Sequence, residues 1–253
     1  MDCEARYEKN GGHPLYGKTD ITYRFNACGF RCEELADESD LRVLTIGCSL
    51  AFGEAVREEE RFSRLVCDKL AARFSCRVAD MNLADGGSSN GYLARMLYLS
   101  LPVLNPDLVL LSFTSSSRRE YFEPGGRVVP LHPKVTNPNN DLVLEEIIDH
   151  YNGLASPYDD LVDAFRNYCG VAAALEDREW VCAFTDPAFK LFMEYLDQSH
   201  TVGSFTAIVD RGRDHGHPGP LTHRNQAEAF WKKLEQEGAI ERLGQTLATR
   251  LGR

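Results

Sequence analysis

The chain has 253 residues, 43% hydrophobic and 26% charged, so it can bury a core of ordinary globular size. Its 28 Lys and Arg against 38 Asp and Glu give a net charge of −10, which disfavours nucleic acid and anionic membrane surfaces as partners. The eight cysteines lack zinc-type spacing, and neither a signal peptide nor a spanning segment is evident. We therefore expect a cytoplasmic protein with free thiols and no metal.

Short apolar strands alternate with helical patterns along the chain. The first 40 residues are rich in turns, and we expect them to wrap the domain rather than form its centre. Strands are predicted at 42–47, 77–83, 107–113, 180–185 and 205–209, and helices at 59–74, 90–104, 141–152, 158–176, 187–198 and 220–251. This alternation predicts one domain, residues 1–253, with a mostly parallel five-stranded sheet in a three-layer α/β/α sandwich of flavodoxin-like type.

One stretch interrupts this alternation. Residues 124–140, PGGRVVPLHPKVTNPNN, contain four prolines, which predicts a loop or a lid-like excursion. A lid over a reactive site would exclude water from it. The stretch therefore keeps acyl transfer open as an alternative to hydrolysis.

Four polar clusters follow predicted strands, at the edge where open parallel sheets bind ligands. They are GCSLAFG (47–53), NLADGGSSNG (82–91), SFTSSSRRE (112–120) and DRGRDHGHPG (210–219). A serine hydroxyl is a weak nucleophile until an imidazole removes its proton, and that imidazole needs a carboxylate to orient it. Asp214 and His217 are three residues apart, so their side chains can meet on one side of a turn. Together with Ser49 on another loop of this edge, Asp214 and His217 predict the hydrolysis of esters by a serine nucleophile.

In this order, the four clusters resemble the four sequence blocks of the SGNH (GDSL-like) hydrolase superfamily. The first resembles the Gly-Asp-Ser-Leu block, with Cys48 in place of the Asp, and YRFNACGFR (23–31) resembles a segment often found before it in bacterial members. The resemblance implies no cofactor. It implies that Ser49 is the nucleophile, that His217 is the base and that Asp214 orients the base. It also implies that the backbone N–H groups of Ser49 and Gly87 donate to the oxyanion.

The third block departs from the family pattern. It usually carries an Asn whose side chain donates to the oxyanion, and Ser116 stands at that position. Losing one such donor typically costs about 100- to 1000-fold in rate. Either Ser116, Asn90, Arg118 or Arg119 replaces this donor, or the enzyme is slow, or its chemistry is shifted. An inward-facing Arg118 or Arg119 would alternatively hold a substrate carboxylate or phosphate.

The leading interpretation is a serine-dependent hydrolase of carboxylic esters, acting on a small or carbohydrate-linked acyl ester. Two alternatives remain: an acyltransferase that passes the acyl group to a sugar or metabolite hydroxyl, and a non-catalytic binding module that kept the cleft. Taken singly, Ser49 is also a common type of helix-capping serine and His217 a common type of loop histidine. The sequence leaves the substrate and the oligomeric state open.

Overall fold

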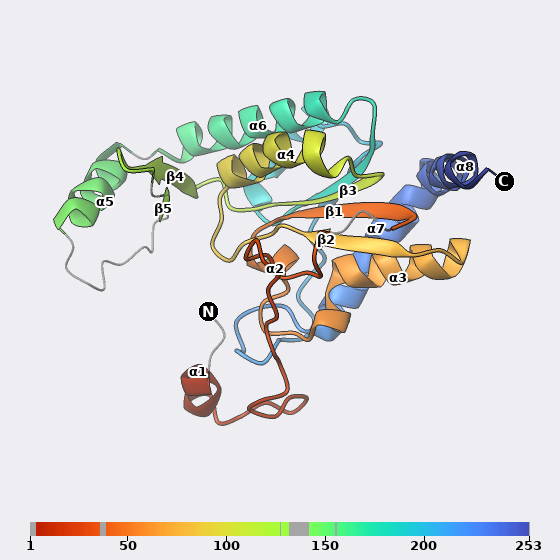
Figure 1. Ribbon diagram of the computed structural model, residues 1–253. Helices are drawn as coiled ribbons and strands as arrows, with labels where there is room; N and C mark the ends of the chain where they lie inside the picture. Colours follow the sequence, from red (N-terminus) through yellow and green to blue (C-terminus); the bar gives the residue numbers. More distant parts are fainter. Residues whose placement is uncertain (1–3, 36–38, 127, 132–141, 155, 253) are drawn as a thin grey trace.

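The computed structural model describes the chain over residues 4–35, 39–126, 128–131, 142–154 and 156–252 (Figure 1). Within these residues, no helix combines the length and the hydropathy that a membrane crossing requires. The seven cysteines among them are all free thiols.

A five-stranded parallel sheet forms the middle layer, in the order β2-β1-β3-β6-β7. Its strands are β1 (Leu41–Gly47), β2 (Val78–Asn82), β3 (Leu108–Phe113), β6 (Glu179–Phe184) and β7 (Thr201–Ser204). Every residue of the central strand β3 is buried, as its nearly unbroken apolar sequence predicts. The chain runs outward from β1 to β2 and then returns to the other side of β1. The strand order therefore reverses between β1 and β3, where such sheets bind ligands.

Helices cover both faces of this sheet (Figure 1). One layer contains α4 (Asn90–Leu104) and α6 (Pro157–Ala174), and the other contains α3 (Phe62–Phe74), α7 (Pro220–Gln236) and α8 (Ala239–Leu251). Side chains of β1 alternate between the two cores: Leu44 and Ile46 pack on the α4 side, whereas Val43 packs on the α3 side. The predicted three-layer α/β/α sandwich with a five-stranded parallel sheet is confirmed.

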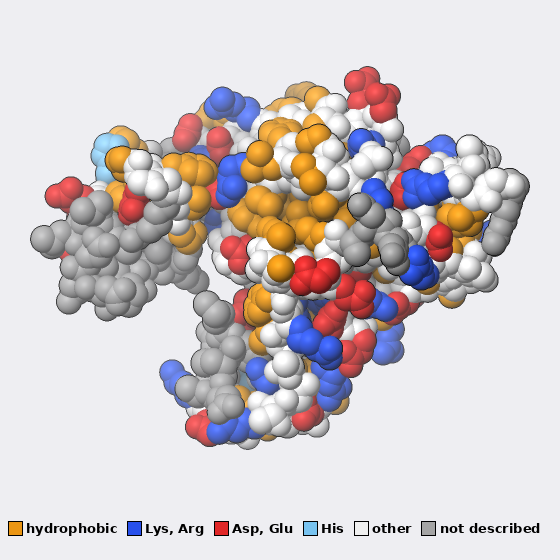
Figure 2. Space-filling model, in the orientation of Figure 1, with side chains coloured by type: hydrophobic (Ala, Val, Ile, Leu, Met, Phe, Trp, Pro, Cys, Tyr) orange, Lys and Arg blue, Asp and Glu red, His pale blue; other side chains and the backbone are white. Residues whose placement is uncertain are grey.

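The remaining elements are short or lie at the margins of the sandwich. They are α1 (Glu4–Lys9), α2 (Ser49–Phe52), the 3₁₀ helix η1 (Glu58–Glu60), the antiparallel pair β4 (Arg119–Phe122) and β5 (Val128–Leu131), α5 (Leu142–Leu154) and the 3₁₀ helix η2 (Pro187–Tyr195). None of the described residues before Leu41 joins the sheet. Figure 2 shows hydrophobic side chains gathered on the face in view, over the part of the molecule where Figure 1 draws α4. Leu99 and Val103 of α4 are exposed.

Three sequence predictions need correction. The last strand is β7, not the apolar stretch 205–209, because the N–H groups of Thr206 and Val209 donate to side chains of α7 instead of to a strand. The helix predicted at 187–198 is the shorter 3₁₀ helix η2. The predicted loop 124–140 contains strand β5, and its residues 132–140 lie outside the described residues.

Candidate active site

Ser49 is the first residue of α2, directly beyond the carboxyl end of β1. Gly47 permits this abrupt turn, because a Cβ there would lie 2.8 Å from the carbonyl oxygen of Ser112 and 2.9 Å from Cβ of Ala51. The side chain of Ser49 is buried, and its backbone N–H lies at the positive end of the short helix. The neighbouring Cys48 is fully buried in the core and is not presented at the edge of the sheet.

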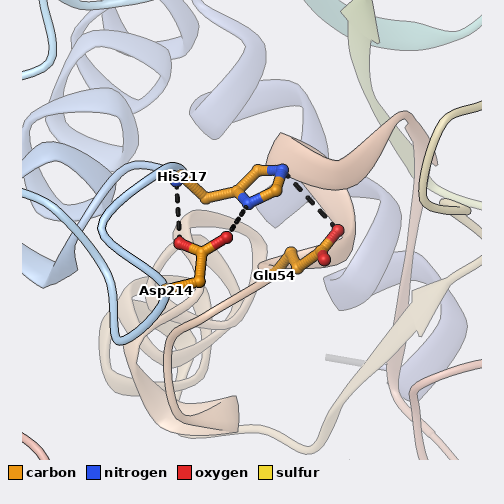
Figure 3. A group of neighbouring side chains, drawn as sticks. All are labelled: Glu54, Asp214 and His217. Atoms are coloured by element: carbon orange, nitrogen blue, oxygen red, sulfur yellow. Dashed lines mark hydrogen bonds and ion pairs between the residues drawn. The ribbon is translucent and has the colours of Figure 1, made fainter. Parts of the chain in front are cut away.

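Asp214 and His217 form a closely bonded pair on the loop that precedes α7 (Figure 3). Nδ1 of His217 lies 2.7 Å from Oδ2 of Asp214, and Oδ1 accepts the backbone N–H groups of Gly216 and His217 at 2.9 Å. Burial disfavours the charged form of Asp214, but these three donors outweigh burial and hold the pKa of Asp214 well below its usual value. The carboxylate therefore stays ionised and can fix the orientation of the ring.

Glu54 contacts the other side of the same ring, and sequence reasoning missed it. Its Oε2 lies 3.6 Å from Nε2 of His217, and its side chain is 7% exposed (Figure 3). Gly53, in the left-handed conformation at φ 76°, ends α2, and the N–H groups of Gly53 and Glu54 donate to the carbonyl of Ser49. Between the described side chains of Ser49 and His217 there is no hydrogen bond. The structure thus pairs His217 with Asp214 at Nδ1 and places Glu54, whose N–H bonds to the carbonyl of Ser49, near Nε2.

The loop after β2 carries the predicted oxyanion glycine. Gly87 has φ 82°, a conformation that favours glycine, and an added Cβ would meet nothing within 4 Å. Gly87 is therefore required for its backbone conformation and not for close packing. Ser88 Oγ and the N–H of Asp85 both donate to the carbonyl of Gly47, which ties this loop to the end of β1.

Ser116 lies after β3, but its hydroxyl is bonded away from the oxyanion role. Its Oγ donates to Oδ2 of Asp186 at 2.7 Å, and its backbone N–H donates to the same oxygen at 2.8 Å. Burial opposes the ionisation of Asp186, yet these donors lower its pKa. In this arrangement Ser116 does not offer its proton to an oxyanion.

Asn90 also has a structural role. Its Oδ1 accepts the N–H of Thr114 at 2.8 Å, and its Nδ2 donates to the carbonyl of Thr114 at 3.2 Å. The buried amide thereby joins the start of α4 to the loop after β3.

The two arginines of the third block differ. Arg119 forms ion pairs with Asp159, Asp160 and Asp163 and so is already paired. Arg118 forms no ion pair with any described residue, and its Nη1 donates to the carbonyl of Ser88 at 3.3 Å. Of the candidates for the missing Asn, Arg118 is the charged one without an ion pair in the part of the chain that the structure describes, and it bonds to the glycine turn.

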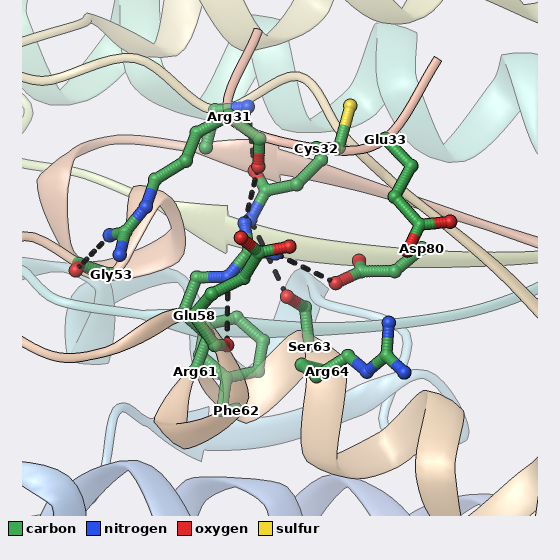
Figure 4. Close-up of polar contacts among 12 residues, drawn as sticks. Arg31, Cys32, Glu33, Gly53, Glu58, Arg61, Phe62, Ser63, Arg64 and Asp80 are labelled. Carbon is green, nitrogen blue, oxygen red and sulfur yellow. Dashed lines mark hydrogen bonds and ion pairs between the residues drawn. The ribbon is translucent and has the colours of Figure 1, made fainter. Parts of the chain in front are cut away.

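Two buried arginines support the segment that carries Glu54 (Figure 4). Arg31 donates to the carbonyls of Gly53 at 2.6 Å and Val56 at 2.9 Å. Arg61 donates to the carbonyl of Arg31 at 2.6 Å and lies 3.1 Å from Oδ2 of Asp80. Side chains far apart in sequence thus fix the turn after α2.

The N-terminal segment braces the loop that carries Asp214 and His217. Asn10 donates to the carbonyl of Asp214 at 3.2 Å, and Nε2 of His215 lies 2.7 Å from the carbonyl of Gly12. Arg213, buried in the same loop, donates to the carbonyl of Lys18 at 2.8 Å. The expected wrapping segment therefore contributes directly to the architecture of the site.

The same cluster also contains the donor atoms of a potential metal site. Glu54, Asp214 and His217 each place one potential ligand atom within 4.8 Å of the others. Nδ1 of His217 is already hydrogen-bonded to Oδ2 of Asp214 at 2.7 Å, and Glu54 lies on the Nε2 side of the ring. The geometry favours an oriented imidazole over a metal centre.

A cavity of about 440 Å³ lies beside the loop after β3. Its lining is mostly apolar, with Tyr151, Pro157, Leu161 and Ala188, and it also includes hydroxyl, amide and carboxylate groups from Ser115, Ser116, Ser117, Asn152, Asp160 and Asp186. A second cavity of about 590 Å³ shares Tyr151 and Asp160 with it and extends toward β4 and α5.

No protein-family model matches the chain, and no curated protein matches its sequence. Similar solved structures include the psychrotrophic esterase EstA from Pseudoalteromonas sp., at 14% identity and TM-score 0.48, and the lipase Lip_vut3 from a goat rumen metagenome, at 14% and 0.46. A catalytic mutant of the acetylxylan esterase Axe2 from Geobacillus stearothermophilus is similar at 17% and 0.35. The likenesses cover 77%, 78% and 77% of this chain and 97%, 97% and 94% of those chains.

Proposed function

We propose that this chain is a serine-dependent hydrolase of carboxylic esters, of the SGNH (GDSL-like) type. The observation that carries the proposal is the 2.7 Å contact between Nδ1 of His217 and the ionised carboxylate of Asp214, at the sheet edge where Ser49 begins α2. A carboxylate that holds the Nδ1–H of a neutral imidazole leaves Nε2 as a base. The four polar loops in family order support the same assignment.

In the proposed reaction, Nε2 of His217 accepts the proton of the Ser49 hydroxyl while Oγ bonds to the ester carbonyl carbon. The carbonyl π electrons move onto the oxygen, where the N–H groups of Ser49 and Gly87 stabilise the charge. His217 then returns the proton to the leaving alcohol as the C–O bond breaks and the carbonyl re-forms. Water attacks the acyl-enzyme by the same steps, which releases the acid and restores Ser49.

The reaction requires one change in the resting arrangement. Nε2 of His217, now 3.6 Å from Oε2 of Glu54, has to meet the hydroxyl of Ser49. Catalytic hydrogen bonds are often long or misaligned without substrate and tighten when it binds. The proposed reaction therefore includes a rearrangement that brings Nε2 to the hydroxyl of Ser49 while Nδ1 stays with Asp214.

For the substrate, we propose a small or carbohydrate-linked acyl ester. The cavity of about 440 Å³ beside Ser116 includes hydroxyl and carboxylate groups that can hydrogen-bond a polyhydroxylated group, although neither Ser49 nor His217 lines it. Arg118 is the proposed replacement for the missing Asn, since a guanidinium beside the glycine turn can donate to an oxyanion.

The test replaces Ser49 by Ala and measures hydrolysis of short-chain p-nitrophenyl esters and covalent labelling by a fluorophosphonate probe. We expect turnover to fall roughly 10⁴-fold or more and labelling to disappear. Cys48→Ala is the matched control, because it removes the adjacent buried thiol and should leave both ester turnover and probe labelling unchanged. Unchanged turnover in Ser49→Ala would refute the proposal.

The same assay separates the two alternatives. With an alcohol acceptor present, a hydrolase releases free acid, whereas an acyltransferase forms a new ester. A wild-type protein that neither turns over esters nor reacts with the probe would instead be a binding module.

A further inference from the structure

The segment YRFNACGFR (23–31) takes no part in the proposed reaction, yet it packs against the turn that follows α2. Tyr23 and Arg31 are its two ends, and the guanidinium carbon of Arg31 lies 4.4 Å from the centre of the Tyr23 ring. The same ring stacks on Phe52, with ring centres 5.8 Å apart. The segment therefore contacts the last residue of the short helix that Ser49 begins.

The backbone of this turn passes twice through the left-handed region. Gly53 has φ 76°, and Ala55 has φ 68°. This conformation suits glycine but is unfavourable for a residue with a Cβ, and Ala55 is fully buried. A strained residue of this kind persists only where its surroundings hold it.

Two side chains of the segment hold this turn. The hydroxyl of Tyr23 accepts the N–H of Ala55 at 2.9 Å. Arg31 donates to the carbonyl of Gly53 at 2.6 Å (Figure 4) and to the carbonyl of Val56 at 2.9 Å. The backbone is thus bonded to the segment at Ala55 and on both sides of it.

The carbonyl of Ala55 faces the loop that carries Asp214 and His217. It accepts the N–H of Arg213, the residue directly before Asp214, at 2.9 Å. Gly212 packs against the same group, because a Cβ there would lie 2.6 Å from the carbonyl oxygen and 2.8 Å from Cβ of Ala55. Both contacts involve the backbone, so the spacing between this loop and the turn after α2 depends on where Ala55 lies.

We propose that Tyr23 is a positioning residue for the pair Ser49 and His217. Its hydroxyl holds Ala55 in the left-handed conformation, and the carbonyl of Ala55 then fixes the His217 loop beside the turn that follows Ser49. This inference rests on the proposed function, because it assigns Ser49 and His217 their roles. With the two backbones held together, the rearrangement that brings Nε2 to the hydroxyl involves side chains alone.

The experiment replaces Tyr23 by Phe, which removes the accepting oxygen and keeps the ring on Phe52. Small displacements of catalytic groups lower the rate of reaction much more than they lower binding. We expect kcat for a short-chain p-nitrophenyl ester to fall about tenfold with KM little changed. The rate of labelling by a fluorophosphonate probe should fall by the same factor, since the probe reacts with Ser49 through the same base.

Tyr168→Phe is the matched control. The hydroxyl of Tyr168 accepts the N–H of Asp197 at 2.7 Å, and the side chain is 3% exposed. This variant removes the same kind of hydrogen bond, but Tyr168 belongs to the core on the opposite face of the sheet from Ala51 of α2. It should lower the midpoint of urea denaturation about as much as Tyr23→Phe does, and leave kcat and labelling unchanged.

A rescue variant separates positioning from a merely structural role. Glycine adopts φ 68° without strain, so Ala55→Gly should keep the turn in place even when the hydroxyl is absent. We expect the double variant Tyr23→Phe with Ala55→Gly to recover kcat to within about threefold of wild type. Such a recovery, without any hydrogen bond being restored, identifies the backbone conformation at residue 55 as what the hydroxyl maintains.

Each outcome decides the proposal. Wild-type kcat in Tyr23→Phe, an equal loss in Tyr168→Phe, or no recovery in the double variant overturns it. Should Tyr23→Phe not fold, Gly212→Ala tests the same contact from the other loop, and an unchanged kcat there overturns the inference. If Ser49→Ala keeps full activity, the proposed function itself fails. An inactive Ser49→Ala together with a fully active Tyr23→Phe refutes only the role of Tyr23.

Discussion

The hydroxyl of Ser116 has a partner before any substrate arrives. Its 2.7 Å bond to Asp186 ties the loop after β3 to the loop after β6. Replacing Ser116 by Ala removes one hydrogen bond and no oxyanion donor, so we expect kcat/KM to fall less than about tenfold. Steady-state kinetics with the ester used for Ser49→Ala checks this. A loss of 100-fold or more, confined to kcat, would return Ser116 to the oxyanion site.

Residue types and their order made Ser49, Asp214 and His217 candidates, because nucleophile, base and orienting acid each need a particular functional group. Their roles stay predictions, and the structure shows the contact between Asp214 and His217. Glu54 was not predictable in this way. Acids after a strand-to-helix turn are usually exposed, and only the left-handed Gly53 together with buried Arg31 turns this one toward His217. Asn90 was predicted as a candidate oxyanion donor, whereas its amide bonds to the backbone of Thr114, a contact that depends on tertiary packing.

At the scale of elements, the turn after α2 depends on a buried ion pair. The side chains of Arg61 and Asp80 are 1% and 4% exposed and lie 3.1 Å apart. Arg61→Met would leave a buried carboxylate unpaired and the carbonyl of Arg31 without its donor, so we expect a loss of about 3 kcal/mol in the free energy of unfolding. Urea denaturation measures it, with the activity of the refolded protein as a second readout.

Asp68→Asn is the matched control. Asp68 lies on the same helix, α3, and its ion pair with Arg64 is solvent-exposed, at 50% and 36%. Exposed pairs of this kind contribute little, so we expect a change below about 0.5 kcal/mol. Equal losses in Arg61→Met and Asp68→Asn would show that the buried pair contributes no more than a surface pair.

Elements with a single dominant signal were predicted well, and elements that depend on neighbours were not. The buried strands β1, β3 and β6 are apolar runs, which identify them from sequence. The edge strand β7 contains glycine and polar residues and pairs with a neighbouring strand on one side only. The apolar stretch 205–209 was therefore predicted as the last strand in its place. Strand β5 includes Pro130, which is tolerated because it lies in a two-stranded ribbon.

At the scale of the whole molecule, the site is assembled from both ends of the chain. Residues 10–18 bond to the loop that carries Asp214, while Arg31 and Arg61 connect the N-terminal segment to α2 and α3. Composition and periodicity predict the layers of the sandwich, since these depend on local patterns. They do not predict the bracing contacts, because each joins segments distant in sequence through one side chain and one carbonyl.

Long-range packing also makes stability depend on pH through His223. This histidine is fully buried on α7, its Nδ1 accepts the N–H of Phe62, and its Nε2 has no hydrogen-bond partner among the described residues. Burial lowers its pKa to about 3 in the folded state, against 6.5 for the free side chain. Below pH 6.5 the unfolded chain therefore binds a proton here that the folded chain does not, and folding is progressively destabilised.

The free energy of unfolding should therefore fall between pH 7 and 4.5 by about 2 to 3 kcal/mol on account of this group, at up to 1.36 kcal/mol per pH unit. His223→Gln removes the titration and keeps a polar side chain near the N–H of Phe62, so its curve should be flatter by that amount. Urea denaturation at closely spaced pH values measures both curves. His150→Gln, at an exposed position, should run parallel to wild type. A parallel curve for His223→Gln would mean that the buried ring takes up its proton in the folded protein as readily as in the unfolded chain.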